Sequence, residues 1–521
     1  MQQNPAPQIR HPMWRKAPPQ ICYIVSMAAV PNLLTALEGL SVVAFLAVAI
    51  SAVAVPDEVL APLDPVALSS GPAEERWMGI FMSDQHVGYA VSREAPTAEG
   101  GRVFQQQSTF SIQAMGNVQR VVAAGTAVTG PDGALKTFDF MLTSPLPVYA
   151  RGEVQAHNLH VTVDQGGSAP EVIDIPLTEP PVLSMTLPSQ VRGKVLRPGL
   201  TFTVPYFDPL TRANATATVL VESPEMLPTG ETAWWLKSSF NGVETRQLVD
   251  PNGEVLREEG SLGLRAERMT REDAMALSNG TPPDLIALTN IPVAPVAGAE
   301  NSHIVTITPG GVDASRFVND PPLQTVDGKT ITISVPLLAE LPHLPVAAQG
   351  AIEEADTEPA MSIPSTDPEM IARAVAVLDG STDRTDAARK INDWVHHYVQ
   401  KVPTIGIPNG LEVLHTAQGD CNEHTALYVS LARAVGIPAR ITAGLVYAPS
   451  IGDAFYYHAW PEVRIGPVGA DGAAGWVPVD PTFGQFPADA THLKIVNGDL
   501  DKQIEIMGLI GKVSLVVNEA R

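Results

Sequence analysis

The sequence predicts an α+β protein in which a β-rich N-terminal part precedes a C-terminal domain of helices packed on an antiparallel sheet. Three observations support this class. Short runs of alternating apolar and polar residues extend from about Trp77 to Arg268 and are separated by turn residues. An acidic, proline-containing segment follows at 342–366. After Asp367 the apolar residues recur at the spacing of helices.

Residues 1–56 have the layout of a secretory signal or a membrane anchor. Arg10, Arg15 and Lys16 precede an apolar run from Gly39 to Val55, and small residues at its end resemble a cleavage site. The run is also nearly long enough to cross a bilayer if it is not cut. A buried core helix is less favoured, because no polar stripe interrupts the run. We therefore expect an exported protein, periplasmic or in the cell envelope, that either loses this segment or stays attached to the membrane through it.

The segment 75–268 is predicted to be an antiparallel β-rich domain. Runs such as 77–82 and 86–92 alternate in the manner of half-buried strands. Pro131-Asp132-Gly133 and Pro251-Asn252-Gly253 each separate two such runs, and this turn chemistry predicts tight hairpins. The similar flanks of the two turns are also compatible with a duplicated β unit, but such turns often arise independently.

Three further segments are expected after this domain. Residues 269–341 form a helical connection around Thr270–Leu277 and then a small β-rich segment. Residues 342–366 form the acidic, proline-containing linker. Residues 367–521 form the C-terminal domain, whose first helix begins at Asp367-Pro368. Helical spacing predicts that this helix runs to about Leu378 and that a second covers 386–400.

Charge and cysteine content exclude some classes of function. The chain of 521 residues has 33 Lys+Arg against 56 Asp+Glu, a formal net charge of −23. A surface of this sign repels nucleic acid, so we expect no nucleic-acid partner. Cys22 and Cys421 are the only two cysteines, which implies no disulfide framework. Most isolated cysteines are small buried hydrophobic residues, so a chemical role for Cys421 needs further support.

The position of Cys421 gives part of that support. Asp420 is a good N-cap, and Gly436-Ile437-Pro438 is a strong stop signal, so a helix is predicted to begin at Cys421 and to end before Gly436. One apolar face is expected along it (Leu427, Leu431 and Val435). The unpaired N–H groups and the dipole at a helix N-terminus stabilise a thiolate and a developing oxyanion.

Two downstream segments add the remaining groups of a thiol site. Residues 456–463 and 475–482 are both predicted to be strands, with His458 on the first and Asp480 on the second. A thiol at a helix N-terminus that faces these strands is a workable Cys–His–Asp arrangement. The carboxylate would orient the imidazole, and the imidazolium would hold the thiolate.

Two rival interpretations involve the same residues. His424 lies three residues after Cys421 and is a competing base, although a surface or substrate-cleft role is favoured for it. Cys421, His424 and His458 are also potential zinc ligands. A structural zinc site usually takes four ligands, commonly with paired spacing, so no metal is expected here. Trp460 and Trp476 flank the site and are assigned no catalytic role.

The motifs resemble the successive blocks of the bacterial transglutaminase-like superfamily, whose catalytic domain is papain-like. They are Gly419-Asp420-Cys421, Gly436-Ile437-Pro438-Ala439-Arg440, His458-Ala459-Trp460, and Trp476 with Asp480-Pro481-Thr482. The resemblance covers roughly Pro368 to the C-terminus, including the tail at His492-Leu493-Lys494. It implies that Cys421 is the nucleophile, His458 the general base and Asp480 the orienting carboxylate, with no cofactor and no metal.

The function expected from these residues is acyl transfer at a glutamine or peptide carbonyl through a thioester. Capture of the thioester by an amine gives cross-linking, and water gives deamidation or, after peptide cleavage, a cysteine protease. The substrate would be a protein or a peptide. The alternative is a non-catalytic envelope binding or assembly protein that uses the papain-like domain as a scaffold, against which the intact Cys–His–Asp set argues.

Overall fold

The computed structural model describes the chain from residue 74 onward, with gaps. The described residues are 74–114, 117–143, 148–164, 170–209, 214–240, 243–260, 263–346, 356–360, 362–402, 408–466, 475–498, 506 and 509–521. The predicted leader at 1–56 and Cys22 lie outside them. Within these ranges no helix is long and apolar enough to cross a membrane.

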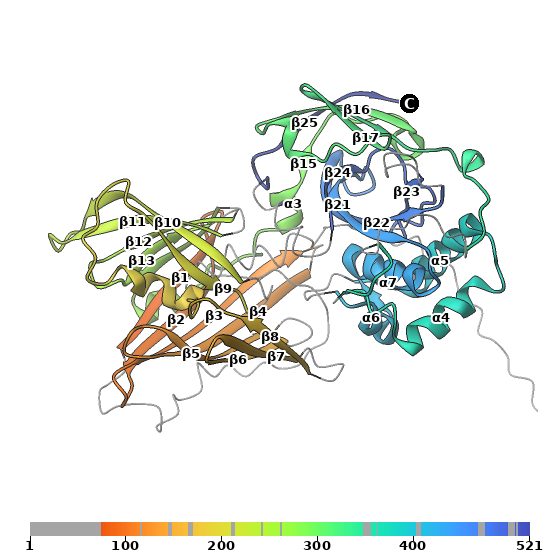
Figure 1. Cartoon of the computed structure of the whole chain (residues 1–521). Coiled ribbons are helices and arrows are strands. Elements are labelled where there is room, and N and C mark those ends of the chain that lie inside the picture. The colour runs from red at the N-terminus through yellow and green to blue at the C-terminus, as the bar shows by residue number, and fades with distance from the viewer. Residues whose placement is uncertain are drawn as a thin grey trace, which may run out of the picture.

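The N-terminal half forms one antiparallel sheet of 14 strands, in the order β8-β7-β6-β5-β4-β3-β2-β1-β14-β13-β12-β11-β10-β9. Figure 1 shows its two halves, β1–β8 and β9–β14, on one side of the molecule. The strands are β1 (Glu74–Met82), β2 (Gln85–Pro96), β3 (Arg102–Ala114), β4 (Asn117–Thr129), β5 (Leu135–Thr143), β6 (Val148–Gln155), β7 (Asn158–Asp164), β8 (Glu171–Pro176), β9 (Thr201–Phe207), β10 (Asn214–Met226), β11 (Thr232–Phe240), β12 (Val243–Val249), β13 (Val255–Glu259) and β14 (Leu264–Met269).

Both predicted hairpin turns are confirmed. Pro131-Asp132-Gly133 joins β4 to β5, and Pro251-Asn252-Gly253 joins β12 to β13, each pair of strands being antiparallel. In each turn the glycine has a positive φ, +79° at Gly133 and +77° at Gly253, which L side chains rarely adopt. The turn residues in the sequence therefore predicted these two connections correctly.

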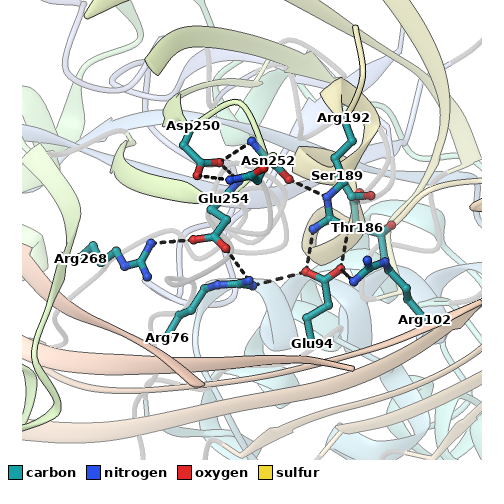
Figure 2. Close-up of polar contacts among 10 residues, drawn as sticks. All are labelled: Arg76, Glu94, Arg102, Thr186, Ser189, Arg192, Asp250, Asn252, Glu254 and Arg268. Atoms are coloured by element: carbon teal, nitrogen blue, oxygen red, sulfur yellow. Dashed lines mark hydrogen bonds and ion pairs between the residues drawn. The ribbon is translucent and has the colours of Figure 1, made fainter. Parts of the chain in front are cut away.

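A partly buried ion-pair network ties the two halves of the sheet together across the 3-10 helix η3 (Ser184–Val191). Glu94 on β2 accepts hydrogen bonds from Arg102 Nη1 at 2.8 Å and from Arg192, the C-cap of η3, at 2.5 and 2.6 Å. Arg76 on β1 joins this carboxylate to Glu254 beside β13, with Nη2 2.6 Å from Glu254 Oε1. Figure 2 shows the network linking elements far apart in the sequence.

The arginines of this network stabilise the charge of Glu94. Burial acts to raise the pKa of Glu94, but the hydrogen bonds and charges of Arg192, Arg102 and Arg76 outweigh it and lower that pKa. A cavity of about 60 Å³ lies beside Glu94 and Arg192. The network therefore links β1, β2 and η3 to the turn before β13.

The connection between the two halves of the chain contributes strands to two other sheets. It contains α2 (Arg271–Met275), α3 (Leu285–Thr289), β15 (Ile291–Pro292), η5 (Ala299–Asn301), β16 (Ile304–Gly310), η6 (Ala314–Arg316), β17 (Gln324–Asp327), β18 (Thr330–Ser334) and η7 (Leu338–Glu340). β16, β17 and β18 join the last strand, β25 (Ser514–Ala520), in a four-stranded sheet, and β15 pairs with β22 (Ala454–Arg464). The last strand of the chain thus packs with strands from residues 304–334, which lie outside the predicted segment 367–521.

In the described residues of the C-terminal part, the helices α4 to α7 lie beside a five-stranded sheet of β15, β22, β21, β24 and β23. Its elements are α4 (Pro368–Leu378), α5 (Arg384–Tyr398), β19 (Gln400–Lys401), α6 (Gly410–Thr416), β20 (Gln418–Gly419), α7 (Cys421–Ala434), β21 (Ala439–Tyr447), β22, β23 (Trp476–Pro478) and β24 (Leu493–Asn497). Figure 1 shows α7 between the sheet and the helices α4, α5 and α6, with which it packs. The predicted α+β class is confirmed.

Helix α7 is central rather than one-sided. The sequence predicts a single apolar face, but every residue from Cys421 to Ala432 is buried. The sheet covers one side of the helix and α4, α5 and α6 cover the others. Polar residues of its first turns, such as Asn422 and Thr425, are therefore in the interior. In a helix at the protein surface, such residues would be exposed to solvent.

The described parts of the predicted linker at 342–366 lie on this domain. Pro342 O accepts a hydrogen bond from Thr385 Oγ1 at 2.5 Å, and Leu344 O accepts one from the Arg384 N–H at 2.7 Å. Ile363 is also buried in the core of the helical layer. Proline and acidic residues without periodicity indicated a spacer, but these contacts hold both of its ends against the helices.

Candidate active site

Cys421 is the first residue of α7, as predicted. Its side chain is 1% exposed and belongs to a buried cluster that includes Tyr457 and Ala459, the residues on either side of His458 in β22. Helix α7 packs directly against this strand. The thiol therefore lies at a helix N-terminus that abuts the strand carrying the predicted histidine.

A capping box fixes the start of this helix. Asp420 Oδ1 accepts the Asn422 N–H at 2.9 Å, and Glu423 Oε2 accepts the Asp420 N–H at 2.9 Å. Burial and the nearby Glu423 carboxylate hold the pKa of Asp420 well above its usual range. The raised pKa disfavours a negative charge at Asp420, which would oppose a thiolate at Cys421.

His458 and Asp480 are in direct contact. His458 Nε2 lies 2.8 Å from Asp480 Oδ2, and both side chains are 0% exposed. The strand prediction for 475–482 is too long, because β23 ends at Pro478 and Asp480, bridged to Gln485, starts the turn beyond it. Since β23 pairs with β22, this turn still places the carboxylate beside the imidazole.

This contact determines the tautomer of His458. A carboxylate only accepts hydrogen bonds, so the proton on the ring must be on Nε2. His458 Nδ1 is buried and has no hydrogen-bond partner among the described residues. Burial lowers the pKa of His458 more than Asp480 raises it, so the ring is neutral at neutral pH. Its Nδ1 lone pair is then available to accept a proton.

The Asp480 carboxylate is fully hydrogen-bonded. Oδ1 accepts the backbone N–H groups of Thr482 and Phe483 at 2.7 and 3.0 Å. Oδ2 accepts His458 Nε2 and, at 3.1 Å, Nε2 of a second histidine, His492. Burial acts to raise the pKa of Asp480, but the charge and hydrogen bonds of the histidines hold it well below its usual range. Asp480 is therefore ionised and fixed in orientation.

His492 was missed as a member of this site. It precedes β24 and is 12 residues from Asp480 along the chain, so no local spacing relates the two. The sequence places it only within a tail that resembles the superfamily. The fold brings it to Asp480 because β24 pairs with β21, which in turn pairs with β22.

His424 is fully buried, so it is not a surface residue. Its Nδ1 lies 2.6 Å from the Asp420 carbonyl oxygen and therefore carries the ring proton. Burial lowers the pKa of His424 to about 4, which keeps the ring neutral. This hydrogen bond gives His424 a role in holding the first turn of α7.

A metal site at these residues is disfavoured by the hydrogen-bond pattern. The histidine and carboxylate atoms of His458, Asp480 and His492 lie within 4.8 Å of one another. A metal ligand needs a bare nitrogen, but both Nε2 atoms point at the Asp480 oxygen at hydrogen-bonding distance. Protons fit these nitrogens better than an ion does.

The two flanking tryptophans have different surroundings. Arg440 and Arg464 lie over the Trp476 ring, 4.3 and 4.6 Å from its centroid, so Trp476 packs against two cations. Trp460 is 1% exposed and its ring lies perpendicular to the His492 imidazole, with centroids 5.0 Å apart. Trp460 therefore packs against His492 and helps to fix the orientation of its ring.

Residues 371–481 match the family model described as the transglutaminase-like superfamily, and this span contains Cys421, His458 and Asp480. No curated protein matches the sequence.

Three solved structures match parts of the chain at low similarity. A β-barrel-like protein of the DUF1849 family from Brucella abortus is 10% identical, with a TM-score of 0.30, over 38% of this chain and 96% of that chain. A candidate cysteine protease from Cytophaga hutchinsonii is 16% identical, with a TM-score of 0.26, over 45% and 85%. A candidate protease from Parabacteroides distasonis is 13% identical, with a TM-score of 0.17, over 66% and 69%.

Proposed function

We propose, from the premise that the chain carries a transglutaminase-like domain, that it is a cysteine-nucleophile acyl-transfer enzyme acting on protein or peptide substrates. Cys421 is the nucleophile, His458 the general base and Asp480 the orienting carboxylate. The observation that carries this proposal is the buried 2.8 Å contact between His458 Nε2 and Asp480 Oδ2, beside the helix that starts at Cys421. It leaves His458 Nδ1 as a base in the strand against which that helix packs.

The first step is a proton transfer coupled to nucleophilic attack. His458 Nδ1 takes the proton of the Cys421 thiol, and the thiolate sulfur attacks the carbonyl carbon of a glutamine side chain or a peptide bond. The positive end of α7 stabilises the thiolate and the developing oxyanion. Asp480 stabilises the imidazolium that forms.

The carbon–nitrogen bond then breaks. The leaving ammonia or amine takes the proton from His458, and the acyl group remains on Cys421 as a thioester. A water molecule or a second amine attacks the thioester while His458 accepts its proton. The thiol is regenerated, and the product is an acid or a new amide. Hydrolysis and cross-linking share every residue of this scheme and differ only in the second nucleophile.

Thiolate formation tests the proposal without knowledge of the substrate. The full chain is treated with iodoacetamide at pH 5–9, and alkylation of the peptide containing Cys421 is followed by mass. Each rate is divided by the rate of the same variant at its high-pH plateau, because the thiol is 1% exposed and slow access scales all rates equally. We expect an inflection well below the ordinary thiol pKa of about 8.5.

Variants assign that inflection to the proposed pair. His458→Ala is expected to move it upward by about one pH unit or more, because no neutral imidazole then takes the proton of the thiol. His303→Ala, at an exposed histidine, is the matched control and should leave the profile unchanged. An inert thiol in the folded protein, or the same profile without His458, would favour the scaffold function instead.

We further propose that the protein acts outside the cytoplasm, from the signal-like layout of residues 1–56. Mass analysis of the N-terminus of the protein from fractionated cells distinguishes a cleaved signal from a retained membrane anchor. A new N-terminus near Val55 in the soluble envelope fraction supports cleavage, and an intact segment in the membrane fraction supports an anchor. An intact chain in the cytoplasmic fraction contradicts export.

A further inference from the structure

Asp480 is shared by two imidazoles, and the proposed triad uses only one of them. The same oxygen, Oδ2, accepts His458 Nε2 at 2.8 Å and His492 Nε2 at 3.1 Å. His492 is 3% exposed, so water does not substitute for these contacts. The second imidazole therefore affects the same carboxylate that orients the first.

The contacts of His492 show that it is charged. Its Nε2 points at the Asp480 carboxylate, and its Nδ1 lies 3.0 Å from the Asp489 carbonyl oxygen and 3.4 Å from Asp489 Oδ1. All three oxygens are acceptors only, since both carboxyl groups are ionised, so each ring nitrogen must carry a proton. An imidazole with two N–H groups is an imidazolium. Hydrogen bonds to two fixed acceptors and the perpendicular Trp460 ring set its orientation.

The directions of the pKa shifts in this group agree with the geometry. Burial acts to lower the pKa of His492, but the hydrogen bonds and charges of Asp480 and Asp489 outweigh burial and raise it to about 10. The same carboxylates keep low pKa values of their own. His492 thus remains positively charged throughout the neutral range.

We propose that His492 is a positioning residue of the Cys421–His458–Asp480 site, which holds Asp480 as a buried imidazolium and thereby weakens the basicity of His458. The inference rests on the proposed function. With His492 charged, the group of Asp480, Asp489 and His492 carries one net negative charge, which balances the imidazolium formed at His458. Without the charge of His492, two unbalanced carboxylates would retain the proton on His458 and hinder its delivery to the leaving amine.

Other titratable groups near this site do not supply the same charge. Asp480 is also within electrostatic range of His396 on α5 and His424 on α7, and Lys401 on β19 influences both of those rings. Burial lowers the pKa of His396 and of His424, so neither is a cation at neutral pH. His492 is therefore the histidine placed to offset the Asp480 charge.

Nuclear magnetic resonance of the full chain tests the proposal directly. Labelling of the histidine rings with ¹⁵N and ¹³C gives the protonation state of each imidazole, and the spectra of His458→Asn and His492→Gln assign the two signals. At pH 7 we expect both ring nitrogens of His492 to be protonated, with no titration below about pH 9. A neutral His492 would overturn the proposal, and this measurement on the unaltered residue does not depend on any variant folding.

The effect on His458 is measured in a Cys421→Ala background, so that the thiol does not couple to the ring. His492→Gln retains a donor for Asp480 but removes the charge, and it is expected to raise the pKa of His458 by about one unit. His303→Gln is the exposed control and should change nothing. An unchanged His458 pKa in a folded His492→Gln protein would show that His492 only stabilises the fold.

Two results separate this inference from the proposed function. If Cys421 is inert toward iodoacetamide in the unsubstituted protein, the enzymatic function fails, whatever the protonation of His492. If Cys421 is activated by His458 but the His458 pKa is unchanged in His492→Gln, the proposed enzymatic function is retained and the positioning role of His492 is rejected.

Discussion

Arg440 and Glu462 face each other across β21 and β22 and form a buried two-point contact. Arg440 Nε and Nη2 lie 2.8 and 2.6 Å from Glu462 Oε2. Lys494 on β24 also binds this carboxylate, at 2.5 Å, and both cations reach Asp320 Oδ2 at 2.6 Å. The cluster joins three strands of the five-stranded sheet to the loop before β17.

Arg440→Met is expected to destabilise the protein strongly. The substitution leaves Glu462, which is 1% exposed, with one cation instead of two, and breaking a buried pair costs about 3 kcal/mol or more. The free energy of unfolding from urea titration measures the loss. Arg151→Met is the matched control, because its partner Asp139 also lies across two strands but the pair is 78% and 57% exposed. That control should lose less than about 1 kcal/mol. Equal losses in the two variants would contradict the buried cluster.

Gly444→Ala is expected to damage the site through the backbone. Gly444 lies opposite His458 in the β21–β22 ladder, and a Cβ there would meet the Leu493 carbonyl oxygen at 2.1 Å. Since main-chain atoms cannot move aside cheaply, β24 must shift, and His492 precedes it directly. We expect a lower melting temperature and a slower relative alkylation of Cys421 at pH 6.

A second glycine provides the control for this variant. Gly452→Ala would meet only the hydroxyl end of Tyr456, at 3.1 Å, and that side chain is able to give way. Its melting temperature and alkylation profile should stay close to those of the unsubstituted protein. A Gly444→Ala protein that behaved in the same way would show that β24 tolerates displacement.

The local chemistry of the sequence predicts most of the elements that carry the site. Asp420 as N-cap and the Gly436 stop signal located α7, and the strand pattern located His458. His492 and the burial of α7 on every side were not predictable in this way. Both depend on which strands and helices pack together, and neither periodicity nor capping within one segment contains that information.

Glu412→Gln is expected to stabilise the protein at pH 8 but not at pH 4.5. Burial and the nearby Glu423 carboxylate raise the pKa of Glu412 on α6 to about 7 from an ordinary value near 4.5. The folded state therefore binds more protons between these two values, so stability falls as the pH rises through them. Glutamine removes the buried charge and should recover about 1 to 3 kcal/mol at pH 8.

Urea titrations at the two pH values measure this effect. Glu99→Gln, at an exposed turn residue, is the control and should change stability by less than about 0.5 kcal/mol at either pH. A Glu412→Gln protein with the same gain at pH 4.5 as at pH 8 would assign the effect to packing instead of charge.

His424→Asn is expected to flatten the loss of stability in acid. Burial lowers the pKa of His424 to about 4, whereas the unfolded chain takes up the proton near pH 6.5. The unfolded state thus binds more protons between these values, and stability is lost as the pH falls through this window, by up to about 3 kcal/mol.

Asparagine retains a donor for the Asp420 carbonyl oxygen but does not titrate. The difference in unfolding free energy between pH 7 and pH 4.5 should therefore shrink, while His303→Asn, at an exposed site, should leave it unchanged. His458 and Asp480 are present in all three proteins, so the comparison reports on His424. An unaltered pH dependence would mean that the His424 ring is protonated in the folded state.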